Sequence, residues 1–219
     1  MIPKIIHYCW FGGKEKPLAV TNYINSWRKH LPDYEIREWN ESNFDYRKWK
    51  FCREAYRMKK FAFVADVCRV YALATVGGIY MDTDVEVIAS FDRFLTNQSF
   101  VGLEDEGKIN TGCMAAAPHT PWVASFLETY RLRSFINWKG RDLSWPNSYL
   151  LKQHLQDNPS QPRIYPLDYF CAKHYTTGEL AVTERTICIH HYDGTWLNNR
   201  LTIARRLKNL WIKITCLIC

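Results

Sequence analysis

The segment "FAFVADVCRVYALATVGGIYMDTDVEV", residues 61–87, constrains the fold more than any other part of the sequence. From Phe61 to Val76 it is apolar on nearly every side at helical spacing, and a helix of that kind is expected to be buried. Gly77 and Gly78 are typical of a helix C-terminus. An apolar strand follows at once, so the charges of the helix and of the strand are expected to face a common cleft.

Asp82 and Asp84 lie two positions apart in that expected strand, whose side chains should alternate between two faces. The polar face would hold Tyr80, Asp82, Asp84 and Glu86, and the apolar face Ile79, Met81, Thr83, Val85 and Val87. Two carboxylates on one face repel each other unless a cation or solvent relieves them. A hard cation such as Mg²⁺ or Mn²⁺ takes oxygen ligands from carboxylates and phosphates. The pair is therefore either a metal site or the solvated end of a strand.

Two further groups could complete such a site. Asp66 and Arg69 are one helical turn apart in the apolar helix, where charges need partners; they form either a structural ion pair or part of a binding site. "TICIHHYDGTW", residues 186–196, is expected to be a strand that ends in the paired His190 and His191. A histidine ligand would favour Mn²⁺, although a single histidine is more often an ordinary core or surface imidazole.

The remainder of the chain predicts an α/β fold. A buried strand in residues 5–11, an amphipathic helix in 18–30 and a strand in 34–39 form a β-α-β beginning. A strand and turn are expected in 109–118, and helices in 121–135 and 149–155. A length of 219 residues with 47% hydrophobic side chains suits one large domain.

The cysteines and the charge limit the class of protein. Eight scattered cysteines, and the lack of a cationic signal peptide, predict reduced core thiols in a cytoplasmic protein. The terminal "CLIC" is only a weak zinc or prenylation signal. A net charge of +7 is compatible with anionic ligands, a membrane surface or nucleic acid. A nucleic-acid-binding module is disfavoured because no motif of such modules is present.

D-x-D after an apolar strand also occurs in haloacid-dehalogenase-type phosphohydrolases. Their motif lies on the first strand and has Thr or Val two residues after the second Asp, where this chain has Glu86. That class fits poorly.

An ordered series of motifs resembles glycosyltransferase family 32, especially its small bacterial members tied to capsular polysaccharide synthesis. The series is "IPKIIHYCWFGG", "WRKHLPDYEIREWNESNFD", "AFVADVCRVYALATVGGIYMDTDVEV", "INTG", "IYPLDYF" and "IHHYDGTW". The resemblance implies a GT-A fold, a Rossmann-like mixed central sheet flanked by helices. It also implies a divalent metal, Mn²⁺ or Mg²⁺, and a nucleotide-sugar donor, most simply a UDP-sugar.

The resemblance assigns the metal ligands residue by residue. Asp84 would bind the metal directly, and Asp82 would bridge metal, ribose and donor sugar. His191 matches the metal ligand of a His-Tyr-x-Gly turn, with His190 as the alternative.

The donor site is implied in the same way. Trp10 would stack on the base, and Asp66 and Arg69 would hold the sugar hydroxyls and the diphosphate. Tyr80 would line the pocket, and Trp196 would close it. Packing in the core is the alternative for both tryptophans.

The catalytic set implied by the resemblance is Asp82, Asp84, Arg69 and Asn110, with Asn110 close to the reacting sugar. Asn147, in the segment "SWPNSYLL" that matches the family loosely, would lie on the acceptor side. Thr195 stands where the family often has Ser, and the hydroxyl is kept.

The function implied is a metal-dependent retaining hexosyltransferase that acts on a saccharide or lipid-linked acceptor in surface polysaccharide synthesis. A catalytically silent nucleotide-sugar-binding protein on the same scaffold is the alternative. Residues 1–197 would form the domain. The basic, apolar tail 198–219 would lie as a helix either on the inner face of an anionic membrane or against the domain.

Overall fold

The computed structural model describes residues 1–104, 107–136 and 145–193. Its strands are β1 (Ile5–Cys9), β2 (Glu35–Trp39), β3 (Gly78–Met81), β4 (Val85–Val87), β5 (Ser99–Glu104), β6 (Lys108–Ala116), β7 (Arg163–Tyr165) and β8 (Cys188–His190). Its α-helices are α1 (Leu18–His30), α2 (Lys50–Arg57), α3 (Phe61–Thr75), α4 (Pro121–Glu128), α5 (Asn147–Gln156) and α6 (Leu167–Phe170). Two 3₁₀ turns, η1 (Tyr46–Lys48) and η2 (Asp92–Phe94), lie between them.

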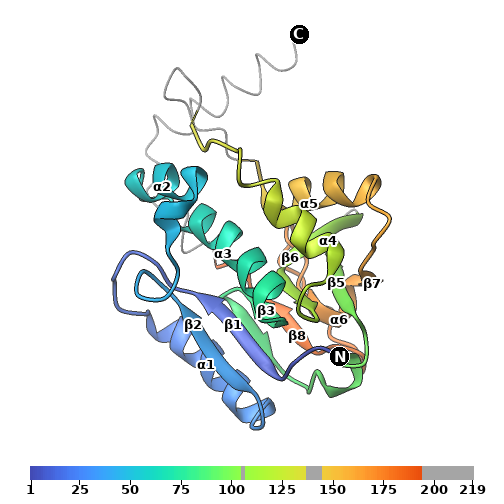
Figure 1. Cartoon of the computed structure of the whole chain (residues 1–219). Helices are drawn as coiled ribbons and strands as arrows, with labels where there is room; N and C mark the ends of the chain where they lie inside the picture. The colour runs from blue at the N-terminus through green and yellow to red at the C-terminus, as the bar shows by residue number, and fades with distance from the viewer. Residues whose placement is uncertain (105–106, 137–144, 194–219) are drawn as a thin grey trace, which may run out of the picture.

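Six of the strands form one mixed sheet, in the order β2-β1-β3-β6-β5-β7 (Figure 1). β1 is parallel to both β2 and β3, whereas β6 is antiparallel to β3 and to β5. The remaining two strands, β4 and β8, pair with each other in a small antiparallel sheet. The predicted α/β fold, with a mixed central sheet flanked by helices, is confirmed.

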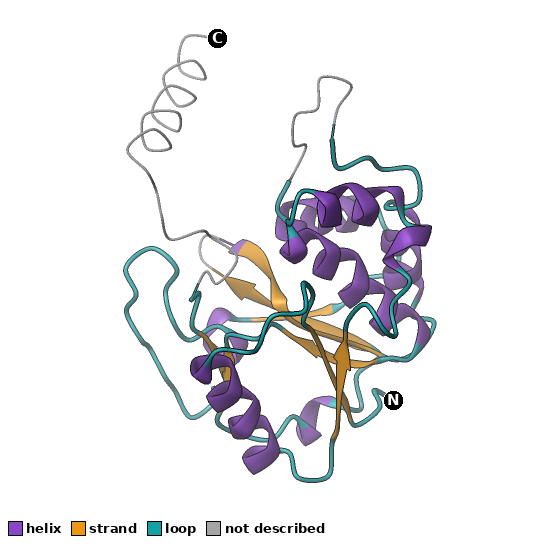
Figure 2. Ribbon diagram, turned by 90° about the vertical axis from the view of Figure 1, so that its left-hand side faces the viewer, coloured by secondary structure: helices purple, strands orange, loops and turns teal. Residues whose placement is uncertain are grey.

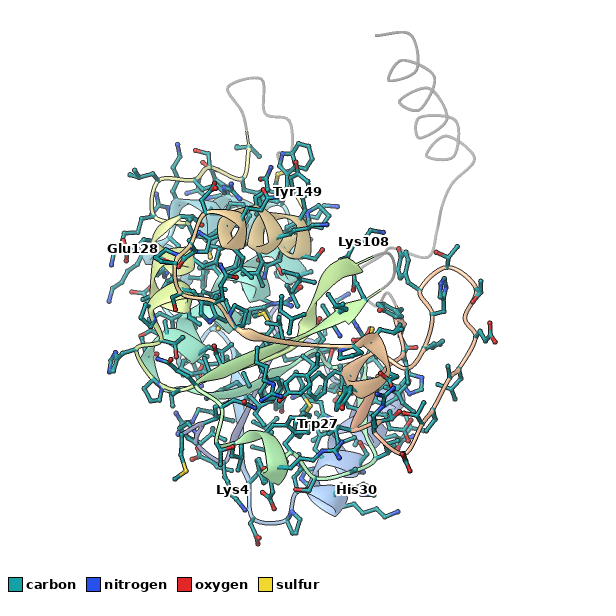
Figure 3. The ribbon with its side chains drawn as sticks, turned by 90° about the vertical axis from the view of Figure 1, so that its right-hand side faces the viewer. Lys4, Trp27, His30, Lys108, Glu128 and Tyr149 are labelled. Atoms are coloured by element: carbon teal, nitrogen blue, oxygen red, sulfur yellow. The ribbon has the colours of Figure 1, made fainter. Side chains whose placement is uncertain are left out.

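The helices cover both faces of the sheet (Figure 2). The apolar residues of α2, α3, α4 and α5 share one core cluster, and those of α1 and α6 share the other with β4 and β8. The side chain of Trp27, labelled in Figure 3, is fully buried in the second cluster, and its indole N–H donates to the carbonyl oxygen of Val85 (2.7 Å). This bond ties α1 to β4, the strand that follows the D-x-D.

The predicted helix and its glycine stop are confirmed. α3 ends at Thr75, and Gly77 and Gly78 have φ values of +71° and +113°. A Cβ on Gly77 would lie 2.6 Å from Cδ of Pro118, so both the backbone conformation and the space require glycine there.

One continuous strand through the D-x-D was predicted, and this is wrong. β3 ends at Met81, and Asp82 to Asp84 form a turn closed by a bond from the Val85 amide to the Asp82 carbonyl (3.1 Å). The chain then enters the second sheet as β4, so the two carboxylates leave the ladder instead of standing side by side on it.

The prediction that residues 79–87 have one apolar and one polar face is confirmed in part. Ile79, Met81, Val85 and Val87 all lie in the core cluster of α1, and Tyr80 lies in that of α3.

Other boundaries differ from the sequence prediction. β1 ends at Cys9, before the apolar run does, and α4 ends at Glu128 instead of continuing toward Phe135. The predicted β-α-β beginning and the helix in 149–155 are confirmed.

Six cysteines are free and buried, as predicted; they are Cys9, Cys52, Cys68, Cys113, Cys171 and Cys188. In the part of the chain that is described, no helix is long and apolar enough to cross a bilayer. Trp196, Thr195 and the tail 198–219 lie outside it.

His7 connects β1 to the glycine turn at the end of α3. Its Nε2 donates to the Gly77 carbonyl (2.7 Å), and its Nδ1 accepts from the indole N–H of Trp39 (3.0 Å). One nitrogen donates and the other accepts, so the ring is held as the neutral imidazole. Burial lowers the pKa of His7 from 6.5 to about 4, more than the Gly77 bond raises it.

We expect His7 to make the fold acid-sensitive. The unfolded chain takes up the proton near pH 6.5, but the folded chain does so only near pH 4, so stability falls as the pH drops through this window. Through His7, the free energy of unfolding is lower by about 3 kcal/mol at pH 4, and it is not lowered above pH 7. Urea unfolding of wild type and His7→Gln at pH 7.5 and 4.5 measures it. His7→Gln should be less stable at pH 7.5 and lose less on acidification; an equal loss in both proteins would contradict the assignment.

Candidate active site

The candidate site lies where β1 and β3 end, beside the D-x-D turn. The neighbours of β1 are both parallel, but β3 has the antiparallel β6 on its other side, so the sheet changes direction here. The carboxyl ends of parallel strands at such a change are a common position for ligands in α/β folds. Asp82 is held at this edge because its amide donates to the Gly112 carbonyl of β6 (2.8 Å).

Three potential metal ligands converge in this place. Ligand atoms of Asp82, Asp84 and His190 all lie within 4.8 Å of one another. Nε2 of His190 is 3.1 Å from Oδ1 of Asp84. His190 closes β8 directly opposite Val85 of β4, so the small antiparallel sheet brings the histidine to the carboxylates.

The turn after β8 wraps around Asp84. The amide of Asp193 donates to Oδ2 of Asp84 (3.1 Å), and the amide of His191 donates to its carbonyl (2.8 Å). Tyr192 has a φ of +56°, unusual for a side-chain-bearing residue, and its ring stacks on that of His190 (centroids 4.1 Å apart). The position of Asp84 is therefore fixed from two directions.

The charges of His190 and Asp84 stabilise each other. Burial disfavours the imidazolium, but the bond to Asp84 and the neighbouring Cys171 thiol raise the pKa of His190 well above its usual value. Burial likewise disfavours the carboxylate, yet the bond from His190 keeps the pKa of Asp84 below its usual value. A metal ion would take the place of the proton between them, because a ligand imidazole must be neutral.

His191 lies elsewhere. Its Nε2 is 2.8 Å from Oε2 of Glu86, and its ring stacks on Tyr23 at 4.9 Å. The resemblance named His191 as the metal ligand and His190 as the alternative; in the structure it is His190 that joins Asp82 and Asp84.

Arg69 links α3 to the D-x-D turn. This agrees with the prediction that the charges of the helix and the two aspartates face a common cleft. Its guanidinium lies 3.0 Å from Oδ1 of Asp66 and 3.2 Å from Oδ1 of Asp82, and its side chain is 6% exposed. It also donates to the Thr111 carbonyl (2.6 Å). Burial disfavours the charge, but Asp82 and Tyr80 raise the pKa of Arg69 above its usual value.

Asp66 and Tyr80 complete this cluster. Burial raises the pKa of Asp66 to about 6, although Arg69 works in the opposite direction. The Tyr80 hydroxyl donates to Oδ1 of Asp82 (2.8 Å), and the guanidinium carbon of Arg69 lies 4.6 Å from the centre of the Tyr80 ring. Asp82 is thus held by both a cation and a hydroxyl.

Asn110 lies in β6, close to this cluster. It is fully buried, and its Oδ1 accepts from the Gly112 amide (2.7 Å). Its Nδ2 has no hydrogen-bond partner among the described residues, and the same is true of Nε of Arg69 and Nδ1 of His190. Buried polar atoms without hydrogen-bond partners are rare, and they are typical of sites that bind a ligand, an ion or an ordered water.

The remaining predicted residues take different positions. Trp10 is half-buried, and its indole N–H donates to the Lys14 carbonyl (2.6 Å) in the loop after β1. Asn147 is buried at the start of α5, where its Oδ1 accepts from the Tyr130 hydroxyl (3.0 Å). Trp196 belongs to the residues that are not described.

Gly112 is a site residue that the sequence reasoning did not identify. A Cβ at this position would lie 2.7 Å from Cε1 of His190 and 3.0 Å from Oδ2 of Asp82. The letters "INTG" contained the glycine, but only the fold shows what a side chain would meet.

We expect Gly112→Ala to weaken metal binding, because the added methyl group displaces His190 and Asp82 by tenths of an ångström. The loss should be about 10- to 100-fold, as when a residue that orients a metal ligand is removed. Isothermal titration with Mn²⁺ measures it. Gly102→Ala is the matched control, since the three atoms nearest to its Cβ all belong to Phe170, the first at 3.1 Å. It should cost stability and leave the metal affinity unchanged; equal metal affinity of Gly112→Ala and wild type would contradict the assignment.

The donor set fits a divalent cation. Two carboxylates and one imidazole suit Mn²⁺ or Mg²⁺, with sites left for phosphate oxygens. Within the described residues, this is the one group of three such side chains close enough to share an ion.

The comparisons with known proteins agree with this chemistry. Residues 17–101 match the family model of a glycosyltransferase sugar-binding region containing a DXD motif. This stretch contains Asp66, Arg69, Asp82 and Asp84. The chain is also 27% identical over 135 residues to inositol phosphoceramide mannosyltransferase 1 of Schizosaccharomyces pombe, covering 56% of this chain and 40% of that protein. The chain therefore spans less than half the length of this curated relative.

Among solved structures, similar chains include the PaToxG glycosyltransferase (TM-score 0.47, 18% identity, 58% of this chain and 59% of that one). Another is a glycosyltransferase involved in glycosylation of the major capsid of PBCV-1 (TM-score 0.48, 12% identity, 86% and 93%). The two sequence similarities support a transferase of the glycosyltransferase kind.

Proposed function

We propose that this chain is a metal-dependent, retaining glycosyltransferase of the GT-A type, which moves a hexose from a nucleotide-sugar to a saccharide or lipid-linked acceptor. The observation that carries the proposal is the convergence of Asp82, Asp84 and His190 within 4.8 Å, next to the buried Arg69. The family match over residues 17–101 supports the same class.

Asp82, Asp84 and His190 would hold the metal, Mn²⁺ or Mg²⁺, and we prefer His190 to His191 for this role. When bound, the ion neutralises charge that develops on the diphosphate leaving group. Arg69 would add a fixed positive charge at the same place, already oriented by Asp66 and Asp82 and so needing no rearrangement.

The donor would lie along the edge formed by β1, β3 and β6. Trp10 would stack on the base, most simply uracil, and Asp66 would accept from sugar hydroxyls. Asn110 would donate its unpartnered Nδ2 to the sugar or the acceptor. Tyr80 would act through Asp82, because its hydroxyl already donates to that carboxylate.

The proposal of retention rests on the resemblance of the motifs and requires no enzyme nucleophile. Asp66 and Asp82 are paired with Arg69, and Asp84 with His190, and the proposal uses these carboxylates to bind the donor and the metal. The acceptor hydroxyl would attack from the face of the leaving group, and a departing phosphate oxygen would take its proton.

The acceptor and the cellular setting are proposed from similarities of sequence. We infer a role in surface or capsular polysaccharide synthesis at the cytoplasmic face, from the resemblance of the motifs. The name of the yeast relative describes mannosyl transfer to a lipid, which supports testing mannose donors and lipid-linked acceptors.

The release of nucleoside diphosphate across a panel of UDP- and GDP-sugars, with and without Mn²⁺, tests the proposal. Metal-dependent release from one donor, absent in Asp84→Asn, would support it and identify the sugar. Tight donor binding without release, even with a panel of saccharide and lipid-linked acceptors, would instead favour the silent nucleotide-sugar-binding alternative. Failure of every donor to bind would contradict the proposal.

A further inference from the structure

The basic residues of the described chain are concentrated in one segment that the proposed reaction does not use. Residues 47–60 carry seven basic side chains and one acidic one, Glu54. The basic residues are Arg47, Lys48, Lys50, Arg53, Arg57, Lys59 and Lys60. This segment comprises most of η1, all of α2 and the turn into α3.

The helix α2 presents its charges on one side. Lys50, Arg53 and Arg57 are exposed and lie at positions i, i+3 and i+7, which form one stripe of a helix. The opposite side packs Phe51 and Cys52 into the core. The stripe is therefore oriented away from the molecule by the packing of the helix.

The stripe is little neutralised. The carboxylate of Glu54 accepts from the amides of Phe135 (2.8 Å) and Ile136 (3.2 Å), and its distance from Nζ of Lys50 is 3.9 Å. The side chains of Arg57 and Lys59 form no ion pair or hydrogen bond with any other residue that the structure describes.

Lys59 is held in an unfavourable backbone conformation. The amides of Lys59 and Lys60 donate to the carbonyls of Tyr56 (2.9 Å) and Ala55 (2.9 Å), which closes α2 in the Schellman arrangement. Lys59 therefore has a φ of +56°, a position that glycine fills at lower cost. A lysine here costs stability and adds a charge beside the stripe.

Two protruding apolar side chains accompany these charges. Met58 is 41% exposed, and Leu132 is 95% exposed in the segment after α4. That segment lies against α2, since Arg131 stacks over Trp49 (5.8 Å) and Glu54 binds Phe135. Figure 1 shows α2 and this segment at the same end of the molecule, away from α1.

We propose that this surface, formed by Lys50, Arg53, Arg57, Met58, Lys59 and Leu132, docks the protein on an anionic lipid bilayer; Arg131 beside it is paired with Glu128 and adds no net charge. Exposed cations next to single protruding apolar side chains match a charged headgroup layer above an acyl core. Duplex nucleic acid would satisfy the charges but would leave Leu132 and Met58 in water.

The surface also adjoins the candidate site. The Tyr56 hydroxyl of α2 and the Gly12 amide of the loop after β1 both donate to Oε1 of Glu41 (2.9 and 2.7 Å). Docking would therefore bring the edge that carries Trp10 near the bilayer. The proposal itself does not depend on catalysis.

Flotation of the full chain with vesicles of phosphatidylcholine, with and without about 30% phosphatidylglycerol, tests the proposal, because the anionic lipid supplies the negative surface potential that attracts basic side chains. Binding is expected only to the anionic vesicles and should weaken with added salt. Arg57→Glu/Lys59→Glu should lower the partition coefficient at least about 25-fold, since each basic residue contributes about fivefold. Leu132→Ser should lower it several-fold without a change in charge.

The matched control is Arg28→Glu/Lys29→Glu, an equal charge change at the C-terminal turn of α1, at the opposite end of the molecule. It should bind nearly as wild type, and the tail 198–219 is present in every variant. Lys59→Gly separates binding from folding, because it should raise the melting temperature and still weaken binding about fivefold.

Three results would overturn the proposal. The first is wild-type protein that fails to float with anionic vesicles. The second is an equal loss in the Arg28/Lys29 and Arg57/Lys59 variants. The third is tighter binding to a short DNA duplex than to anionic vesicles at the same ionic strength.

Discussion

Arg69→Met is expected to destabilise the fold by about 3–5 kcal/mol at pH 8, because it leaves two buried or half-buried carboxylates without their cation. Asp66 and Asp82 lie 3.0 and 3.2 Å from the guanidinium, and the methionine keeps most of the volume without the charge. Urea unfolding measures the change in the free energy of unfolding.

The pH dependence of this variant separates charge from packing. The pKa of Asp66 is about 6 even beside Arg69, and without the cation it would be higher still. Asp66 is therefore protonated at pH 5 in the variant, and the destabilisation should be smaller there than at pH 8.

Arg69→Met/Asp66→Asn is the companion variant, and it should recover part of the lost stability at pH 8. A destabilisation that is the same at pH 5 and pH 8, and that Asp66→Asn does not relieve, would show that the pair is not electrostatically coupled.

Asp84→Asn should lower the affinity for Mn²⁺ by more than about 100-fold, since the loss of residues that merely orient a ligand already costs 10- to 100-fold. The change removes a charged ligand and also the partner of His190, which lies 3.1 Å away. Isothermal titration of Mn²⁺ measures the affinity, and the metal-dependent release of nucleoside diphosphate should disappear with it.

Glu86→Gln is the control for this variant. Its carboxylate also binds a histidine, His191 at 2.8 Å, but it is more exposed and does not belong to the three-residue group. Its affinity for Mn²⁺ should stay within about twofold of wild type, the spread typical of surface charges. Similar losses in both variants would mean that the metal is attracted by general negative charge alone.

The sequence predicted the elements that local patterns determine. The helix in residues 61–75 follows from a continuous apolar pattern, and its end follows from two glycines that adopt positive φ values. The pairing of Asp66 with Arg69 follows from their spacing and from the need of buried charges for partners. These features depend on neighbours within one or two helical turns.

Features that depend on distant partners could not be predicted in the same way. β3 ends at Met81: the Asp82 amide still bonds to the Gly112 carbonyl of β6, thirty positions away, and a turn closed by the Val85 amide then leads the chain into a second sheet. The strand pattern alone favoured continued alternation. Likewise, only the register of β8 against β4 places His190, and not His191, beside Asp84.

Residues 47–60 illustrate a different limit of prediction from the sequence. Their basic character was visible in the sequence, but its meaning depends on which side of α2 is buried and on the contact with Trp49 and Glu54 from beyond α4. In the sequence alone, the tail 198–219 shows the simpler pattern of basic and apolar residues.

A titration of Mn²⁺ into wild type, His190→Ala and His191→Ala, in the presence of UDP and, separately, GDP, tests the proposed metal site. Free Mn²⁺ is followed by its electron paramagnetic resonance signal. We predict one tight Mn²⁺ per chain with one of the nucleotides, lost in His190→Ala and kept in His191→Ala. Weak, multiple Mn²⁺ binding that neither substitution alters would contradict this prediction.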